Sequence, residues 1–206
     1  MISKGKILNL CCGIGGNRKL WEGYQITAVE SDPKIAKVYQ ILYPNDTVVV
    51  GDAYQYLLDH FMEFGKVWGS FPCQSHSKMM KFTRHNVIKY PDLRFYGVII
   101  FLTHFFKGKW VIENVNPYYT PLIPPTVKIG RHLFWSNCEI SPEFVQDNAK
   151  NFINLGSVKD SAYLKDWLGI HYEGNLYYKD NHDPNQVLRN AVHPDLGLYI
   201  LNQMKD

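Results

Sequence analysis

A cysteine preceded by a proline is the residue of this chain best suited to nucleophilic chemistry. Cys73 lies in the sequence Phe-Pro-Cys-Gln of residues 71–74, between an apolar run and polar residues, as expected of a nucleophile on a loop that leaves a strand. A carboxyl group, Glu113, holds the matching position after the next apolar run. A glycine-rich turn at residues 12–16 precedes both. A thiol, a carboxyl group and a ligand turn at the strand ends of one sheet indicate chemistry on a pyrimidine ring.

Regular elements must position these groups, and the first half of the chain alternates short apolar runs with amphipathic stretches. This alternation predicts an α/β fold with a parallel sheet covered by helices, because strands buried on both faces carry few charges. The predicted strands are 6–11, 25–30, 47–51, 66–70 and 109–113, and the predicted helices are 16–22, 33–42, 53–63 and 92–106. Later segments predict a strand at 131–135, a short helix at 160–167 and an apolar helix at 196–204.

The size and composition of the chain limit its class. A chain of 206 residues can bury one core with a small appendage, and its net charge of +3 permits a nucleic-acid partner. The four cysteines form no CxxC pair and predict reduced thiols. The absence of a signal peptide and the shortness of the longest apolar run, 97–106, predict a cytoplasmic protein. No metal site is expected, because His76 lacks a second ligand at suitable spacing.

The glycine turn and the strand ends that follow it predict a cofactor site. Gly13 and Gly15 let the backbone approach a ligand, whereas Arg18 stands where a dinucleotide fingerprint has its third glycine, which disfavours NAD. Glu30 ends the second strand, where a carboxylate can accept hydrogen bonds from both ribose hydroxyls. Asp52 follows the third strand and could bind an adenine amino group, although a helix cap is the plainer role for one carboxylate alone. Together these groups suit S-adenosylmethionine.

With these residues in place, the chain resembles the cytosine-5 DNA methyltransferases, in particular small members from phages and prophages. Residues 8–16 resemble the first motif of that family, and Glu30 and Asp52 fall on the second and third. The resemblance extends to the nucleophile motif at 71–74, the Glu-Asn-Val motif at 113–115, the eighth motif at 130–135 and the tenth motif at 189–192. It implies a Rossmann-like methyltransferase sheet that binds S-adenosylmethionine and releases S-adenosylhomocysteine.

The chain departs from the family pattern at four places. Cys11 stands where the family usually has a phenylalanine against the adenine, and Asn17 replaces an aromatic residue. At the eighth motif either Arg131 or His132 takes the place of the catalytic arginine, and we favour Arg131 because its guanidinium is a bidentate donor. Only residues 136–188 separate the eighth motif from the tenth, so the target-recognition domain is much reduced.

The resemblance implies a covalent mechanism on a flipped-out cytosine. The Cys73 thiolate would add to C6 of the ring and so make C5 nucleophilic toward a methyl group. Glu113 would hold the N3 and amino edge, while Arg131 or His132 would bind O2. The segment after the nucleophile would close over DNA. The predicted substrate and DNA contacts are Pro72, Gln74, Ser75, Ser77, Lys78, Lys81, Arg84 and Asn114.

The resemblance also divides the chain into three parts. Residues 1–136 would form the catalytic domain, 137–185 a reduced target-recognition region and 186–206 a segment that returns to the catalytic domain. Tyr177 and Tyr178 belong to an aromatic group in the middle part that could supply groove contacts for a short target sequence, although packing is the plainer role. The predicted cofactor contacts are Cys11, Gly13, Gly15, Gly16, Glu30, Asp52 and Asn190.

Two alternatives to DNA methylation stay open. Methylation of RNA or of a free nucleotide would use the same motifs, and a catalytically inactive DNA-binding relative would keep the fold without the reaction. The preferred function implies double-stranded DNA as the partner, in a bacterial or phage-infected cell. It also allows a cognate restriction endonuclease, as in a restriction-modification pair.

Overall fold

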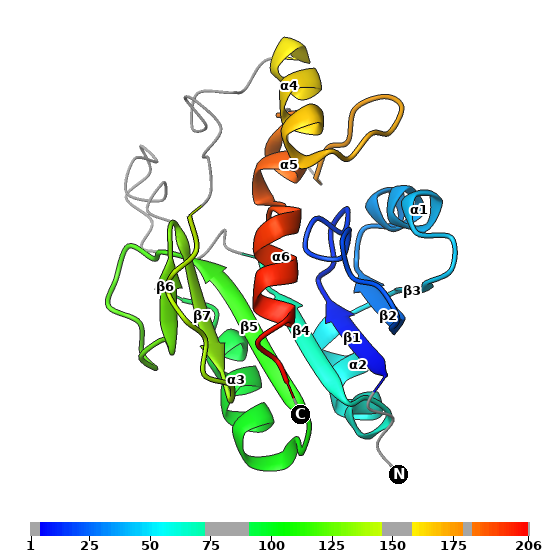
Figure 1. The fold of residues 1–206 in the computed structure, drawn as a ribbon. Coiled ribbons are helices and arrows are strands. Elements are labelled where there is room, and N and C mark those ends of the chain that lie inside the picture. Colours follow the sequence, from blue (N-terminus) through cyan, green and yellow to red (C-terminus); the bar gives the residue numbers. More distant parts are fainter. Residues whose placement is uncertain (1–4, 73–90, 146–157, 179–182, 206) are drawn as a thin grey trace.

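The structure, a computed structural model, describes residues 5–72, 91–145, 158–178 and 183–205 (Figure 1). The strands are β1 (Lys6–Leu10), β2 (Gln25–Glu30), β3 (Thr47–Val50), β4 (Lys66–Ser70), β5 (Lys109–Val115), β6 (Val127–Ile129) and β7 (His132–Ser136). The helices are α1 (Pro33–Leu42), α2 (Ala53–His60), α3 (Leu93–Phe105), α4 (Val158–Leu168), α5 (Gln186–Asn190) and α6 (Pro194–Leu201). A 3₁₀ helix, η1 (Phe61–Glu63), follows α2 directly.

The strands form one sheet of seven in the order β3-β2-β1-β4-β5-β7-β6. The first five in this order pair in parallel, and β7 runs antiparallel to both β5 and β6. This is the Rossmann-like α/β fold that the sequence predicts. The strand order reverses between β1 and β4, and ligands of such sheets bind at this reversal, beyond the carboxyl ends of the strands.

The central strands are buried on both faces, which explains why their sequences carry few charges. Leu8 of β1 and Ile112 of β5 belong to the apolar cluster formed with α2 and α3. The preceding residues, Ile7 and Val111, belong to a second cluster formed with α6. Figure 1 shows α6 crossing one face of the sheet, with α2 and α3 on the other. The sheet is therefore a rigid base from which its carboxyl ends present side chains.

The helices α4 and α5 pack against the loop that follows β1. Leu164 of α4 and Leu188 of α5 share an apolar cluster with Ile14 of that loop and Ile35 of α1. In Figure 1 both helices lie beyond the carboxyl ends of the strands. The C-terminal part of the chain thus closes over the edge of the sheet where ligands are expected.

Most predicted elements are confirmed with small differences at their ends. The helix predicted at 16–22 is wrong, because residues 16–20 form consecutive turns. The Arg18 guanidinium explains this local path: Nε lies 2.8 Å from Asp46 Oδ2, and Nη1 donates to the Trp21 carbonyl at 2.6 Å. Two glycines before Arg18 also disfavour a helix. The short strand β6 was not predicted, and 61–63 is 3₁₀ rather than α-helical.

Candidate active site

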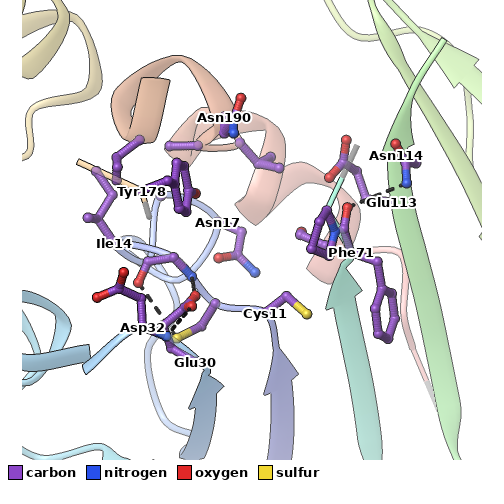
Figure 2. A pocket seen from close by; sticks show the side chains of 18 of the residues that line it. Cys11, Ile14, Asn17, Glu30, Asp32, Phe71, Glu113, Asn114, Tyr178 and Asn190 are labelled. Atoms are coloured by element: carbon purple, nitrogen blue, oxygen red, sulfur yellow. Dashed lines mark hydrogen bonds between the residues drawn. The ribbon is translucent and has the colours of Figure 1, made fainter. Parts of the chain in front are cut away.

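A cavity of about 290 Å³ lies beyond the carboxyl ends of the strands (Figure 2). It extends from Glu30 at the end of β2, past the β1 loop, to Glu113 in β5. The described residues that line it are Cys11, Cys12, Gly13, Ile14, Gly16, Asn17, Glu30, Ser31, Asp32, Ser70, Phe71, Pro72, Glu113, Asn114, Val115, Tyr178, Val187, Asn190, Ala191 and Val192. This volume is close to the lower end of the range for small-molecule sites.

Glu30 is held at one end of the cavity by main-chain donors. The backbone N–H of Gly13 donates to Glu30 Oε2 at 3.0 Å, and that of Asp32 donates to Oε1 at 3.0 Å. The Ser31 hydroxyl lies 3.3 Å from Oε1. The side chain is only 7% exposed. Because backbone N–H groups can only donate, this carboxylate is fixed as an acceptor with lone pairs left for a ligand.

The glycines of the β1 loop serve different purposes. Gly13 lines the cavity, whereas Gly15 lies outside its lining, contrary to the prediction of a cofactor contact. A Cβ at Gly15 would lie 2.4 Å from the Tyr43 ring, so this glycine lets α1 approach. Gly16 lines the cavity, and a Cβ there would lie 2.3 Å from the Val192 carbonyl oxygen. Gly16 therefore permits close contact with the C-terminal segment.

Cys11 lines the cavity where β1 ends, in a left-handed conformation with φ of 51°. Burial raises the pKa of its thiol well above the ordinary value, and the nearby charges of Glu30 and Asp52 raise it further. The Cys11 sulfur is therefore a neutral thiol near neutral pH and a poor nucleophile. Although it shares the cavity with Glu113, Cys11 is therefore not a candidate for a nucleophile.

Asn17 is fixed by a buried amide pair rather than by aromatic packing. Its Nδ2 donates to Asn9 Oδ1 at 2.9 Å, and Asn9 lies in β1 with its side chain fully buried. The pair holds the turn over the end of the strand, where the buried Asn17 lines the cavity. Sequence reasoning noted Asn17 only as a departure, and a buried asparagine in a strand such as Asn9 is the signal that could have indicated its partner.

Two aspartates cap helices near the cavity, but only one of them, Asp32, lines it. Asp32 accepts from the backbone N–H of Lys34 at 2.8 Å at the start of α1, is buried, and lines the cavity. Asp52 accepts from Tyr54 N–H at 2.8 Å at the start of α2, is exposed, and lies outside the lining. Asp52, the predicted adenine contact, thus has the cap role that the sequence also offered, and Asp32 is a cavity residue that the sequence analysis did not predict.

Glu113 lies at the other end of the cavity and is held by a side chain. Glu113 Oε1 lies 2.6 Å from His132 Nδ1, and the two residues are 5% and 7% exposed. The antiparallel register pairs Val115 with His132 and Glu113 with Phe134. Alternate residues of a strand share a face, so this register brings the imidazole to the carboxyl group. An imidazole nitrogen can donate or accept, so the pair can move a proton between its members.

Arg131, which the sequence analysis favours over His132, has a different contact. Its Nη2 donates to the Arg189 carbonyl of α5 at 2.7 Å. Neither Arg131 nor His132 lines the cavity directly. Adjacent residues at the start of a strand point to opposite sides, and here only His132 reaches Glu113. Arg131 instead joins β7 to the C-terminal segment.

The strand β4 ends at the same end of the cavity. Its last residue, Ser70, pairs with Glu113 in the parallel register of β4 and β5. Phe71 and Pro72 follow and line the cavity, and Asn114 Nδ2 lies 3.4 Å from the Phe71 carbonyl oxygen. Asn114 thereby ties the two strand ends together. Cys73, Gln74, Ser75, Ser77, Lys78, Lys81 and Arg84 lie outside the described residues.

The charge of the cavity favours a cationic ligand. Glu30, Asp32 and Glu113 bring three carboxyl groups to the lining, and no lysine, arginine or histidine occurs among the described lining residues. A phosphate would meet these carboxylates without a compensating cation, whereas a sulfonium would be attracted to them. The donor set therefore fits S-adenosylmethionine better than a phosphorylated nucleotide.

Comparison with known protein families identifies the family of this chain. The sequence profile of the family described as C-5 cytosine-specific DNA methylase matches residues 5–117, more than half of the chain. The chain belongs to this methylase family. The matched residues include β1 to β5, and thus Glu30 and Glu113. S-adenosylmethionine is the methyl donor that the methylase family uses.

Several solved structures are similar to the chain. A Spodoptera frugiperda DNMT2 mutant is 24% identical, covering 53% of this chain and 35% of that one, with a TM-score of 0.39. A protein described as an E. coli prophage DNA modification methyltransferase is 20% identical, covering 56% and 33%, with a TM-score of 0.39. Aeropyrum pernix fibrillarin with bound S-adenosyl-L-methionine is 12% identical, covering 55% and 47%, with a TM-score of 0.34. The chain spans about a third of the length of the first two.

No curated protein sequence matches the chain. Within the described residues, no helix of this methylase is long and apolar enough to cross a membrane. The same part of the chain holds no group of three or more His, Cys, Asp or Glu that could bind a metal ion.

Proposed function

We propose that this methylase transfers a methyl group from S-adenosylmethionine to C5 of cytosine in DNA, with Cys73 as a covalent nucleophile. The observation that carries the proposal is the meeting of two strand ends in one cavity. The pairing of Ser70 with Glu113 makes the loop that leads to Cys73 start beside a buried carboxyl group. Glu30, a carboxylate suited to a ribose, lines the same cavity.

The Glu30 end would hold the cofactor. Glu30 would accept hydrogen bonds from the ribose hydroxyls, with Gly13 and Cys11 beside it and Asn190 on the opposite wall. When bound, S-adenosylmethionine supplies an electrophilic methyl group on a positively charged sulfur. The three lining carboxyl groups attract that positive charge. No basic side chain among the described lining residues repels it.

The Glu113 end would hold the cytosine. The Cys73 thiolate would add to C6, which turns C5 into an enamine-like carbon. Methylation at C5 leaves a proton there, which a solvent-derived base would remove as the Cys73 sulfur departs from C6. Glu113 would bind the N3 and amino edge of the ring. Because a duplex hides C6, the base would have to be flipped into the cavity.

His132 would act as a positioning residue for Glu113. Its Nδ1 holds one carboxyl oxygen at 2.6 Å, which leaves the other oxygen of Glu113 for the base. Since imidazole and carboxyl can exchange a proton, Glu113 could present either a carboxylate to the amino group or an acid to N3. This role replaces the O2 contact that the sequence analysis assigned to Arg131 or His132.

The division of the chain follows from this function. Residues 1–136 would perform the chemistry, 137–185 would recognise a short target sequence and 186–206 would complete the cofactor wall. The predicted loop contacts after Cys73 would bind the DNA backbone or replace the flipped base. A cytoplasmic location and a cognate restriction endonuclease remain predictions of the resemblance.

Methyl transfer to matched substrates tests the proposal. The purified chain is incubated with S-adenosylmethionine labelled in its methyl group and with duplex DNA, transfer RNA or dCMP in parallel. We expect label in duplex DNA, as 5-methylcytosine, and none with Cys73→Ala. Label in RNA or dCMP alone would overturn the choice of substrate.

Covalent trapping tests the mechanism separately. DNA that contains 5-fluorocytosine has no removable proton at C5, so the enzyme should remain attached through Cys73. We expect a stable adduct with the wild type and none with Cys73→Ala. Tight binding of S-adenosylhomocysteine without any adduct would instead indicate an inactive DNA-binding relative.

A further inference from the structure

One residue of the cavity wall comes from the segment that the sequence analysis assigned to DNA. Tyr178 lines the cavity together with Val187 and Asn190, but it lies on the stretch after α4, residues 169–178, which we call the post-α4 segment. Figure 2 shows the Tyr178 ring beside Ile14, on the Glu30 side of the cavity and away from Glu113. Its neighbour Tyr177 is 42% exposed and does not line the cavity.

The post-α4 segment is attached to both α4 and the β1 loop. Lys165 Nζ donates to the Tyr172 carbonyl at 2.6 Å and to the Gly174 carbonyl at 3.1 Å. From the β1 loop, Lys19 Nζ donates to the Gly169 carbonyl. Tyr178 itself packs against the apolar cluster that contains Ile14. The ring is therefore held in place by the same loop that supplies Gly13 and Gly16.

Tyr178 supplies the aromatic surface at the cofactor end of the cavity. Phe71 and Tyr178 are the two aromatic residues among the described lining residues. Phe71 is only 3% exposed, packs against the Tyr54 ring with ring centroids 4.7 Å apart, and lies at the Glu113 end. Its ring points away from the cavity in Figure 2. A flat adenine bound near Glu30 would thus find one described aromatic ring, that of Tyr178.

We propose that Tyr178 contacts the adenine ring of the bound cofactor, so that the post-α4 segment is part of the cofactor site. The proposal rests on the proposed function for the identity of the ligand. An aromatic side chain binds any base through its π face, and this contact does not need the phenol hydroxyl. Cofactor binding would then also stabilise the post-α4 segment, because a ligand stabilises the groups that form its site.

Calorimetric binding of S-adenosylhomocysteine and of adenosine tests the contact without any turnover. We expect Tyr178→Leu, which keeps apolar volume against Ile14 but removes the ring, to weaken both ligands by about 5- to 150-fold. Tyr178→Phe should remain within about threefold of the wild type, since the ring is kept. Tyr177→Leu is the matched control and should leave both affinities unchanged. Circular dichroism melting of each variant without ligand verifies that it folds.

The outcomes separate this contact from the proposed function. Failure of the wild type to bind S-adenosylhomocysteine would overturn the cofactor assignment itself. Normal binding by both the wild type and Tyr178→Leu would overturn only the role of Tyr178. Equal losses in Tyr178→Leu and Tyr178→Phe would show that the hydroxyl, not the ring, makes the contact. If Tyr178→Leu lost duplex DNA binding but kept S-adenosylhomocysteine binding, Tyr178 would be a contact to the DNA groove and not to the cofactor.

Hydrogen exchange gives a second measurement that does not depend on binding affinities. We expect S-adenosylhomocysteine to slow amide exchange in the post-α4 segment of the wild type as well as in the β1 loop. The Tyr178→Leu variant, at a ligand concentration that saturates it, should show this protection in the β1 loop alone. Absence of protection in the post-α4 segment of the wild type would contradict the proposal.

Discussion

The two carboxyl groups at the ends of the cavity are both buried, yet they are held in different ways. Glu30 accepts from the backbone N–H groups of Gly13 and Asp32, which cannot accept a proton in return. Glu113 faces the imidazole of His132, which can donate or accept. Main-chain donors suit a carboxylate with one constant task, and a side-chain partner suits a carboxyl group that must change state during a reaction.

The difference follows from local topology. Glu30 is the last residue of β2, and the chain turns at once into Ser31 and the cap of α1, so backbone donors surround it. Glu113 lies within β5, whose backbone groups pair with β4 and β7. A carboxyl group inside a ladder must find its partner on a neighbouring strand, and β7 supplies His132. We therefore expect Glu30 to govern affinity and Glu113 to govern rate.

The largest expected effect is that of Glu113→Gln on the rate. The amide keeps the shape of the side chain but cannot move a proton, so methyl transfer to DNA should fall about 10²- to 10⁴-fold. Binding of S-adenosylhomocysteine should stay within about threefold of the wild type, because the far end of the cavity is unchanged. Single-turnover rates and calorimetry measure the two quantities. A large loss of cofactor affinity would show that the two ends are not independent.

Replacement of His132 tests how the carboxyl group at the Glu113 end of the cavity is held. His132→Leu removes the partner of a buried carboxyl group, and a lost hydrogen bond to a charged group corresponds to roughly a 10- to 100-fold decrease in kcat. His132→Gln keeps a donor and should lose less. The cofactor KM should change little in either variant, which separates positioning from general damage to the site. If kcat were equal in His132→Leu and the wild type, Glu113 would not need its imidazole partner.

At the other end, Glu30→Gln should act on affinity. One amide oxygen can still accept a hydrogen bond, but the charge is lost and the amide nitrogen would oppose the N–H of Gly13 or Asp32. We expect S-adenosylhomocysteine to bind about 10- to 100-fold more weakly, while kcat at saturating cofactor stays within about threefold. A fall in kcat with unchanged affinity would reverse the roles of the two carboxyl groups.

The parallel sheet, and the position of Glu30 and Glu113 at one edge of it, could be predicted from the sequence, because apolar runs and strand ends are local signals. The sequence was insufficient for contacts that depend on strand pairing. Which of Arg131 and His132 contacts Glu113 depends on the register of β7 against β5, which no local pattern encodes. Likewise, the contact of Tyr178 with the cavity depends on where α4 packs, and its aromatic neighbours gave no sign of it.

The helix predicted at 16–22, after the glycine turn, is absent for a related reason. Local propensity favours a helix after such a turn in dinucleotide-binding proteins, but in this chain Arg18 is drawn to Asp46, which lies before β3 and far away in sequence. Asp46 also accepts from the Tyr39 hydroxyl at 2.9 Å. A partly buried ion pair between distant residues thus overrides the local preference. The loop is positioned by α1 and not by a helix of its own.

The smallest expected effect tests whether Glu30 is charged in the folded protein. Burial is the main cause that raises the Cys11 pKa, and Glu30 and then Asp52 raise it further. Removal of the Glu30 charge should lower the Cys11 pKa, and each unit of decrease gives about tenfold more thiolate at a given pH. Alkylation of Cys11 by iodoacetamide at pH 8, followed by mass spectrometry, should be a few-fold faster in Glu30→Gln. Asp52→Asn should accelerate it less, and Glu113→Gln should leave it unchanged. Equal rates of Cys11 alkylation in Glu30→Gln and the wild type would mean that Glu30 carries little charge at this site. Glu30 and Glu113 would then no longer differ as a fixed carboxylate and a carboxyl group that changes state.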